Sequence, residues 1–266
     1  MKRLLAIVVV LVSLVTAALA QTTPTASQSA APAPDASTHK AMEWMNKMIA
    51  ALGGDAYLNV QDMTQEGRTY GFSHGESAGG APFFRYYKYP DKERLELTKQ
   101  RDWIIIHNGD KGWEQTFRGT SFEDPEALAA YVERSKFALD RIIRVWLHEP
   151  GLLIFDDGTA IAERKQAEKI TLMNSKNEAV SIFIDSLTFL PIKRAYQHRN
   201  KTYKDIDTEE ETYDNWHDVQ GVKSPYDITR LHNGEPQNQR FINKITYNTG
   251  LAESLFEPKG PVKDAK

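Results

Sequence analysis

Cysteine is absent from the chain of 266 residues. The protein therefore has no disulfide bond, no thiolate nucleophile and no metal site with cysteine ligands. Its stability has to come from the burial of apolar side chains. After removal of the terminal segments described below, roughly 225 residues remain, which is long enough to bury a sizeable core.

Clusters of basic residues are also missing. Lys and Arg number 33 against 36 Asp and Glu, so the formal net charge is −3, and it becomes −5 without Lys2 and Arg3. Binding to nucleic acid needs a concentrated positive face, because phosphate groups supply most of the affinity. This composition therefore argues against a nucleic acid partner.

Long apolar runs are scarce, and the clearest one lies at the start of the chain. Lys2 and Arg3 precede an apolar run from Leu4 to Val15, and Ala18-Leu19-Ala20 follows it. This order is typical of a cleaved signal peptide, residues 1–20. A membrane anchor would need ~20 apolar residues, more than this run has. We expect an exported protein that does not span a membrane after cleavage.

The residues that follow have little to bury. Residues 21–38 are rich in Thr, Ala, Ser, Pro and Gln, which is typical of a flexible linker. A short helix is then predicted from His39 to Leu52, with Met42, Met45, Ile49 and Leu52 on its apolar face and Gly53-Gly54 at its end.

Most of the remaining chain has the pattern of strands joined by short turns. Asn108-Gly109, Asp157-Gly158, Asp218 to Gly221 and Asn233-Gly234 are turn signals between apolar runs. Helices are not expected between the strands from Tyr70 to Arg118, which excludes parallel βαβ units there. The segment from Phe83 to Tyr89 has aromatic residues on both faces, so it is either buried on both or lines a cavity with one.

One stretch departs from this pattern of strands and turns and predicts a long amphipathic helix from Asp124 to Pro150. Asp124 is a good N-cap, Pro125 suits the first helical position, and Pro150 with Gly151 stops the helix. Apolar residues recur at steps of three and four: Leu128, Tyr131, Val132, Leu139, Ile142, Ile143 and Trp146. We expect a mainly β (α+β) fold, in which a curved antiparallel sheet of about ten strands covers this one long helix and the one short helix.

Signals of catalysis and of metal binding are weak. Gly71-Phe72-Ser73-His74-Gly75 matches the G-x-S-x-G pattern, but that motif needs a helix directly after the serine, and the run to Pro82 cannot start one. No two of the seven histidines have the four-residue spacing of a zinc protease. Asp156-Asp157 beside Gly158 is explained by a turn. The prediction is therefore a protein that is not an enzyme and has no cofactor and no metal.

Several segments, taken in order, are similar to the outer-membrane lipoprotein-sorting family, which includes the periplasmic lipoprotein carrier. They are Tyr89 to Glu96, a proline-led strand pair; Ile104 to Trp113, a hairpin ending in tryptophan; Ile182 to Pro191, an I-D-x-x-T-x-x-P-like turn; Asp218 to Pro225, a D-x-x-G-V-x-x-P hairpin; and Asn248 to Phe256, a closing segment. The resemblance spans about Leu52 to Pro258. It departs from the family at Tyr89, where the carrier has an arginine that is important for cargo release, and this chain is longer than the carrier.

The resemblance implies an unclosed half-barrel over helices, with a hydrophobic cavity for acyl chains, as a single domain at 39–260 followed by a tail at 261–266. The function it implies is that of a periplasmic carrier or binding protein for an acylated or lipid ligand. Candidate lining residues are Phe84, Tyr86, Leu95, Leu97, Ile104, Ile106, Trp113, Phe117, Ile142 and Trp146. A filled core remains open, as do two other functions: an exported hydrolase using Ser73, and an envelope interaction module that uses open sheet edges to bind protein partners.

Overall fold

The computed structural model describes residues 34–200 and 202–263. All its elements belong to one unit, Ala33–Lys266. The helices are α1 (Pro34–Leu52), α2 (Asp55–Leu58), α3 (Pro125–Lys136), α4 (Leu139–Arg144), η1 (Trp146–His148) and η2 (Glu253–Phe256). The strands are β1 (Asp62–Ser73), β2 (Glu76–Lys88), β3 (Lys92–Leu97), β4 (Trp103–Asn108), β5 (Lys111–Thr116), β6 (Gly119–Phe122), β7 (Leu153–Ala162), β8 (Lys165–Met173), β9 (Ala179–Asp185), β10 (Pro191–Arg199), β11 (Ile206–Val219), β12 (Val222–His232), β13 (Glu235–Tyr247) and β14 (Val262–Lys263). The predicted signal peptide (1–20), the linker as far as residue 33, and the tail residues 264–266 lie outside the described residues.

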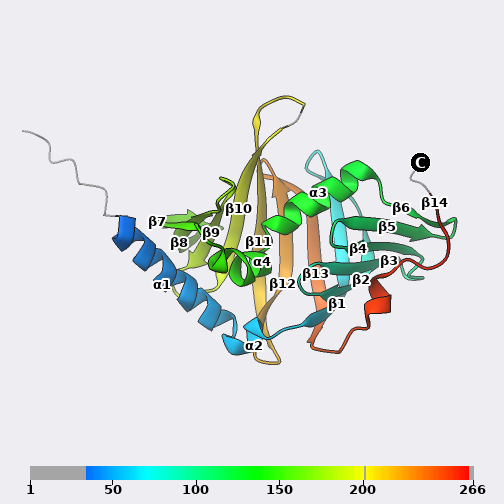
Figure 1. The fold of residues 1–266 in the computed structure, drawn as a ribbon, viewed down its shortest axis with the longest axis horizontal. Coiled ribbons are helices and arrows are strands. Elements are labelled where there is room, and N and C mark those ends of the chain that lie inside the picture. The colour runs from blue at the N-terminus through cyan, green and yellow to red at the C-terminus, as the bar shows by residue number, and fades with distance from the viewer. Residues whose placement is uncertain (1–33, 201, 264–266) are drawn as a thin grey trace, which may run out of the picture. The chain divides into compact units, whose positions relative to one another are not determined.

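The fourteen strands of the described part form one sheet, in the order β14-β6-β5-β4-β3-β2-β1-β13-β12-β11-β10-β9-β8-β7 (Figure 1). Two meanders, β1 to β6 and β7 to β13, are joined where β1 pairs antiparallel with β13. The pair of β14 with β6 is parallel, whereas β1 pairs antiparallel with both its neighbours. Because β7 and β14 are the two edges, the sheet is not closed. The prediction of a mainly β fold with an unclosed antiparallel sheet is thus confirmed, with fourteen strands instead of about ten.

The tight turns account for most of this meander. Asn233 and Gly234 have φ angles of 51° and 80° between β12 and β13, and Gln220 and Gly221 have φ angles of 54° and 80° between β11 and β12. Two successive positive φ angles are typical of a type I′ turn, whose twist matches that of the flanking strands. The hairpins predicted at these sites are confirmed.

The turn predicted at Asp157-Gly158 is wrong. Residues 153–162 form one strand, β7, in which the register shifts by a residue between Asp156 and Gly158. Glycine is tolerated in such a bulge because it adapts to an irregular backbone. The chain reverses instead at Glu163 and Arg164, which adopt φ angles of 46° and 62° without being glycine.

The single long helix predicted from Asp124 to Pro150 is broken into α3, α4 and η1. Its predicted start is confirmed, since the Asp124 carboxylate accepts hydrogen bonds from the backbone N–H groups of Glu126 and Ala127, each at 3.0 Å. The break occurs at Ala138, whose backbone is extended. It allows Phe137 to turn into the core, where its ring stacks on Tyr196 at 3.9 Å. Burial of that ring outweighs the helical propensity of the segment.

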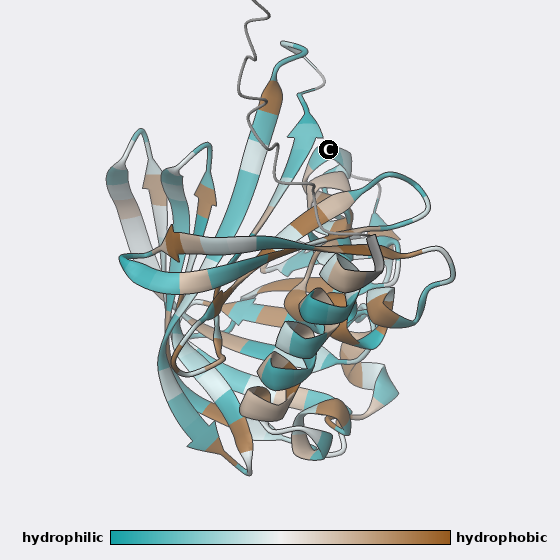
Figure 2. Cartoon of the chain, turned by 90° about the vertical axis from the view of Figure 1, so that its left-hand side faces the viewer, coloured by the Kyte–Doolittle hydropathy of each residue, from teal (hydrophilic) through white to brown (hydrophobic). Residues whose placement is uncertain are grey.

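Helix α1 begins at Pro34, earlier than the predicted His39, and packs along the β7 side of the sheet (Figures 1 and 2). Its fully buried side chains include Met45, Met48 and Leu52. The helix ends as predicted at Gly53, whose φ of 126° and whose approach to the Gly221 carbonyl leave no room for a side chain. None of the described helices is long and apolar enough to cross a membrane.

Candidate functional site

A cavity of about 520 Å³ lies between the sheet and the helical segment α3–α4. We call the face of the sheet that lines it the inner face. Residues from β1, β2, β3, β10, β11, β12 and β13 contribute to the wall, together with α3, α4 and the ends of α1 and α2. This volume is within the range that holds one small-molecule ligand.

The strand registers decide which side chains face the cavity. On β2, Phe83 pairs with Leu97 and Arg85 pairs with Leu95, and all four line the cavity. Because alternate residues of a strand point to opposite faces, the residues between them point outward. The aromatic strand thus presents Phe83, Arg85 and Tyr87 inward.

The cavity is apolar at one end of the strands. Met63 pairs with Tyr247 on one side and with Tyr87 on the other, and all three are largely buried and line the cavity. Leu52, Tyr57, Tyr89, Leu139 and Trp216 complete this part of the lining.

Helix α3 covers the cavity without being buried itself. Tyr131, Arg134 and Ser135 line the cavity, but no residue of α3 is fully buried. Figure 1 shows α3 crossing in front of the central strands. The helix is fixed to the sheet by Tyr131, whose ring stacks on His107 of β4 at 3.4 Å.

His107 is buried between two carboxylates. Its Nε2 lies 2.8 Å from Glu123, and its Nδ1 lies 3.8 Å from Glu93, which also accepts a hydrogen bond from Arg85. Burial disfavours the imidazolium, but Glu123 and Glu93 raise the pKa of His107 above its usual value. Burial also opposes the charge on Glu93, yet Arg85 lowers the pKa of that carboxyl. The network favours a protonated histidine under α3.

Tyr89, which precedes Pro90 after β2, lines the cavity. An arginine lies beside it: the Arg144 guanidinium is 4.3 Å from the Tyr89 ring centre. Arg144 also donates hydrogen bonds to the carbonyl oxygens of Tyr57, Leu58 and Val60. A cation from α4 therefore holds α2 and Tyr89 together at the apolar end of the cavity.

The opposite end of the cavity carries charges. Glu211 of β11 lies 3.6 Å from Arg194 and 3.5 Å from Arg240, and it accepts a hydrogen bond from the Tyr213 hydroxyl at 2.9 Å. Burial opposes ionisation, but Arg194 and Arg240 lower the pKa of Glu211 to about 2. Asp140 of α4 lies instead near Tyr57 and Tyr89 at the apolar end, and burial raises its pKa against the effect of Arg144 and Arg85.

Two of the ten predicted lining residues, Leu95 and Leu97, line this cavity. Phe84 and Tyr86 lie on the outer face, where both contact Arg101. Ile104, Ile106 and Trp113 also belong to the outer face, part of which is covered by η2, and Phe117 is exposed. Ile142 and Trp146 are buried in the core beneath α1.

The residues that the sequence prediction missed are mainly charged. Arg85, Arg194, Arg230 and Arg240 point inward, although arginine is usually exposed. A signal was present: each lies two positions from a buried residue of the same face, as Arg230 does from Ile228 and Arg240 from Ile242.

The G-x-S-x-G segment is a hairpin, not a strand-to-helix turn. Ser73 ends β1, His74 and Gly75 form the turn, and β2 starts at Glu76. The structural setting that this motif requires is not present. Within residues 34–200 and 202–263, no group of three or more histidine, aspartate and glutamate side chains is arranged to hold a metal ion.

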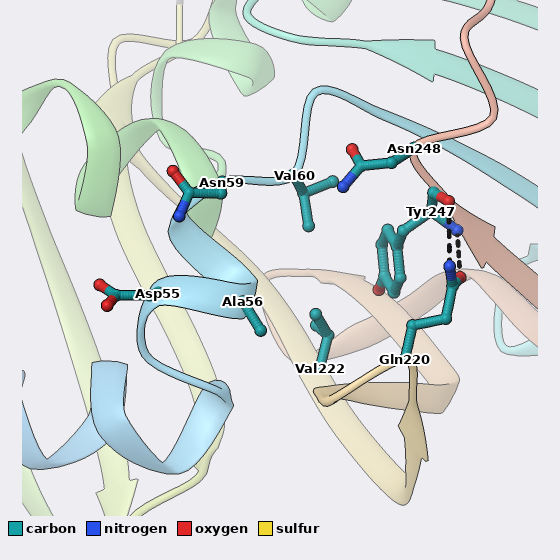
Figure 3. Close-up of a pocket in the computed structure, with 8 residues that line it drawn as sticks. All are labelled: Asp55, Ala56, Asn59, Val60, Gln220, Val222, Tyr247 and Asn248. Carbon is teal, nitrogen blue, oxygen red and sulfur yellow. Dashed lines mark hydrogen bonds between the residues drawn. The ribbon is translucent and has the colours of Figure 1, made fainter.

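A second, smaller hollow of about 280 Å³ lies where α2 meets the β11–β12 turn (Figure 3). Gln220 forms two hydrogen bonds with the backbone of Tyr247, accepting at 2.7 Å and donating at 3.2 Å. These bonds extend the pairing at the end of β13, so the Gln220 amide already has partners. The larger cavity is the better candidate for a ligand site.

No protein-family model matches this sequence. No curated protein matches it either. Solved structures do match. A DUF1329 family protein from Desulfovibrio piger has a TM-score of 0.56 at 11% identity, with 82% of this chain and 97% of that chain covered. A putative outer membrane lipoprotein-sorting protein domain from Vibrio parahaemolyticus has a TM-score of 0.55 at 10% identity, with 84% and 97% covered.

A LolA superfamily protein from Nitrosomonas europaea has a TM-score of 0.51 at 11% identity, with 82% of this chain and 97% of that chain covered. The chain has the LolA-type fold. The predicted resemblance to lipoprotein-sorting proteins is thereby confirmed at the level of the fold. Identities this low show the fold alone, and a shared fold does not determine ligand or partner.

Proposed function

We propose that this chain is a non-catalytic carrier or binding protein that holds one acylated or lipid ligand in the cavity beneath α3. The observation that carries the proposal is the cavity itself, about 520 Å³, covered by a helix with no fully buried side chain. Burial of an acyl chain there would contribute ~0.8 kcal/mol per CH₂ group. Opening would break the stacking of Tyr131 on His107, but because no side chain of α3 is fully buried the further cost in packing is limited.

The export predicted from the sequence is consistent with the same function. The predicted signal peptide, residues 1–20, would deliver the folded unit to the periplasm. Lipids that cross an aqueous compartment need a protein that shields their acyl chains. Amino-terminal sequencing of protein recovered from the periplasm tests this step, with a start near Gln21 as the expected result.

The binding test is uptake of a fluorescent fatty acid by the purified protein. Ala138 lines the cavity, so Ala138→Phe is expected to fill part of it and to reduce uptake about tenfold or more. Ala130→Phe is the matched control, because Ala130 is exposed on α3 and should leave uptake unchanged. Equal uptake by both variants, or no uptake by the unaltered protein, would contradict the proposal.

A second candidate is an envelope module that binds a protein along a sheet edge. It is favoured by the edge strand β7, which exposes Leu153, Phe155 and Ile161. Cross-linking in cells tests it: a stable partner that is lost in Ile161→Lys would support this function, and its absence would count against it.

A further inference from the structure

Cationic side chains outnumber carboxylates in the cavity. Arginines reach it from four strands and from α3: Arg85, Arg134, Arg194, Arg230 and Arg240. Lys223 also lines the cavity, but it lies 3.6 Å from Asp218 and is therefore already paired. The carboxylates among the lining residues are Glu93, Asp140 and Glu211. Binding of a neutral apolar ligand would not require this excess of positive charge.

The existing ion pairs leave part of this charge uncompensated. Glu93 is paired with Arg85, and Glu211 is shared by Arg194 and Arg240. Neither Arg134 nor Arg230 forms an ion pair or a side-chain hydrogen bond with another described residue. Two guanidinium groups at the same end of the cavity are thus without a direct ion pair, and Glu211 and Glu209 act on Arg230 only from a distance.

Arg230 is the clearer of these two examples of an unpaired cation. Its Nε atom is buried and has no hydrogen-bond partner among the described residues. Burial and the nearby Arg134 both lower its pKa, but a guanidinium stays charged at neutral pH. A buried donor on a charged group without a partner is destabilising, so a bound anion would remove that cost.

The unpaired charge and the apolar wall lie at opposite ends of the same strands. Met63 pairs with Tyr247 at the apolar end, whereas Thr69, six residues further along β1, pairs with Arg240. On β12, Arg230 lies opposite Glu211 on one side and Asn238 on the other. Six residues of strand span about 20 Å, so the cavity has a cationic end and an apolar end that far apart.

We propose that the ligand is a single-chain amphiphile with an anionic headgroup, a carboxylate or a phosphate monoester, held by Arg230, Arg134 and Arg240 with its chain directed toward Met63 and Tyr87. This inference rests on the proposed carrier function and names the chemistry of its ligand. Guanidinium groups bind both headgroups through paired charge-assisted hydrogen bonds.

The test is a displacement assay with four probes: dodecanoate, methyl dodecanoate, dodecyl phosphate and inorganic phosphate. The two anionic amphiphiles are expected to bind about tenfold or more tightly than the methyl ester, since a hydrogen bond between charged groups supplies at least that factor. Inorganic phosphate alone should not displace the fluorescent fatty acid. If it did so as well as dodecyl phosphate, the cluster would be a free-anion site and the inference would fail.

The variant Arg230→Met tests the contribution of the headgroup to binding separately from that of the acyl chain. It should weaken binding of dodecanoate about tenfold and leave methyl dodecanoate unchanged, whereas Arg118→Met, at an exposed turn, should alter neither. The melting temperature of Arg230→Met should stay equal or rise, because an unpaired buried charge is removed. If the acid and the ester bind equally to all three proteins, the inference fails and the carrier function stands. If no amphiphile binds, the carrier function fails as well.

Discussion

Both halves of the inner face are built from antiparallel strands, but one half is packed solid and the other encloses a cavity. Beneath α1 and α4, strands β7 to β10 form a filled core in which Ile170, Leu172, Ile182 and Ile184 have no exposed surface. Beneath α3, strands β11 to β13 and β1 to β3 enclose the cavity. One half of the sheet therefore supplies the stability that a chain without cysteine needs, and the other half is left available for a ligand.

The largest expected effect distinguishes these halves by stability. Ile182→Ala should lower the free energy of unfolding by about 2–5 kcal/mol, because it leaves a void in a tightly packed region. Leu95→Ala should cost about 1 kcal/mol or less, since its side chain already borders an open cavity. Urea denaturation measures both. Equal losses would mean that the two halves are packed alike.

A smaller loss of stability is expected from a substitution on β1, in the wall of the cavity. A side-chain carbon added at Gly67 would lie 2.2 Å from the Phe241 carbonyl oxygen and 2.9 Å from the Phe83 ring, so Gly67→Ala should destabilise the protein by about 1–3 kcal/mol. Gly71, on the same strand, has open space around it and is the matched control. If Gly71→Ala were equally destabilising, the close packing of β1 against β13 would not be the cause.

The mildest effect concerns the attachment of α3. Because the folded state raises the pKa of His107, its contribution to stability is fully present below the unfolded value of about 6.5 and is lost as the pH rises through the higher folded value. The unaltered protein should therefore lose stability over this range relative to His107→Gln. Denaturation at a series of pH values measures the difference. Parallel pH profiles for the two proteins would show that the carboxylates do not hold a charged histidine there.

Local signals in the sequence predicted an unclosed antiparallel sheet and several of its hairpins, but about ten strands instead of fourteen. Asn233-Gly234 fixed a hairpin because both residues accept positive φ angles, and Asp124 fixed a helix start because its carboxylate caps two N–H groups. Asp157-Gly158 misled, because the same dipeptide fits a bulge, while Glu163 and Arg164 turned the chain without a glycine.

Less of the candidate site than of the fold could be predicted from the sequence. The aromatic strand has large side chains on both faces, so its parity alone did not show that Phe83 and Tyr87 face inward while Phe84 and Tyr86 face outward. The inward arginines contradict the usual exposure of charged residues, and only the pairing of distant strands brings Arg194, Arg230 and Arg240 together. A local sequence pattern does not show which distant strands pair or in which register, so it could not predict this cluster of arginines.

The central claim is that the half beneath α3 holds a lipid, and native mass spectrometry of gently purified exported protein tests it most directly. We predict a folded species heavier than the polypeptide by the mass of one amphiphile, which is retained in Ala130→Phe and lost in Ala138→Phe. A folded species with the mass of the polypeptide alone, which also takes up no added fatty acid, would contradict the claim.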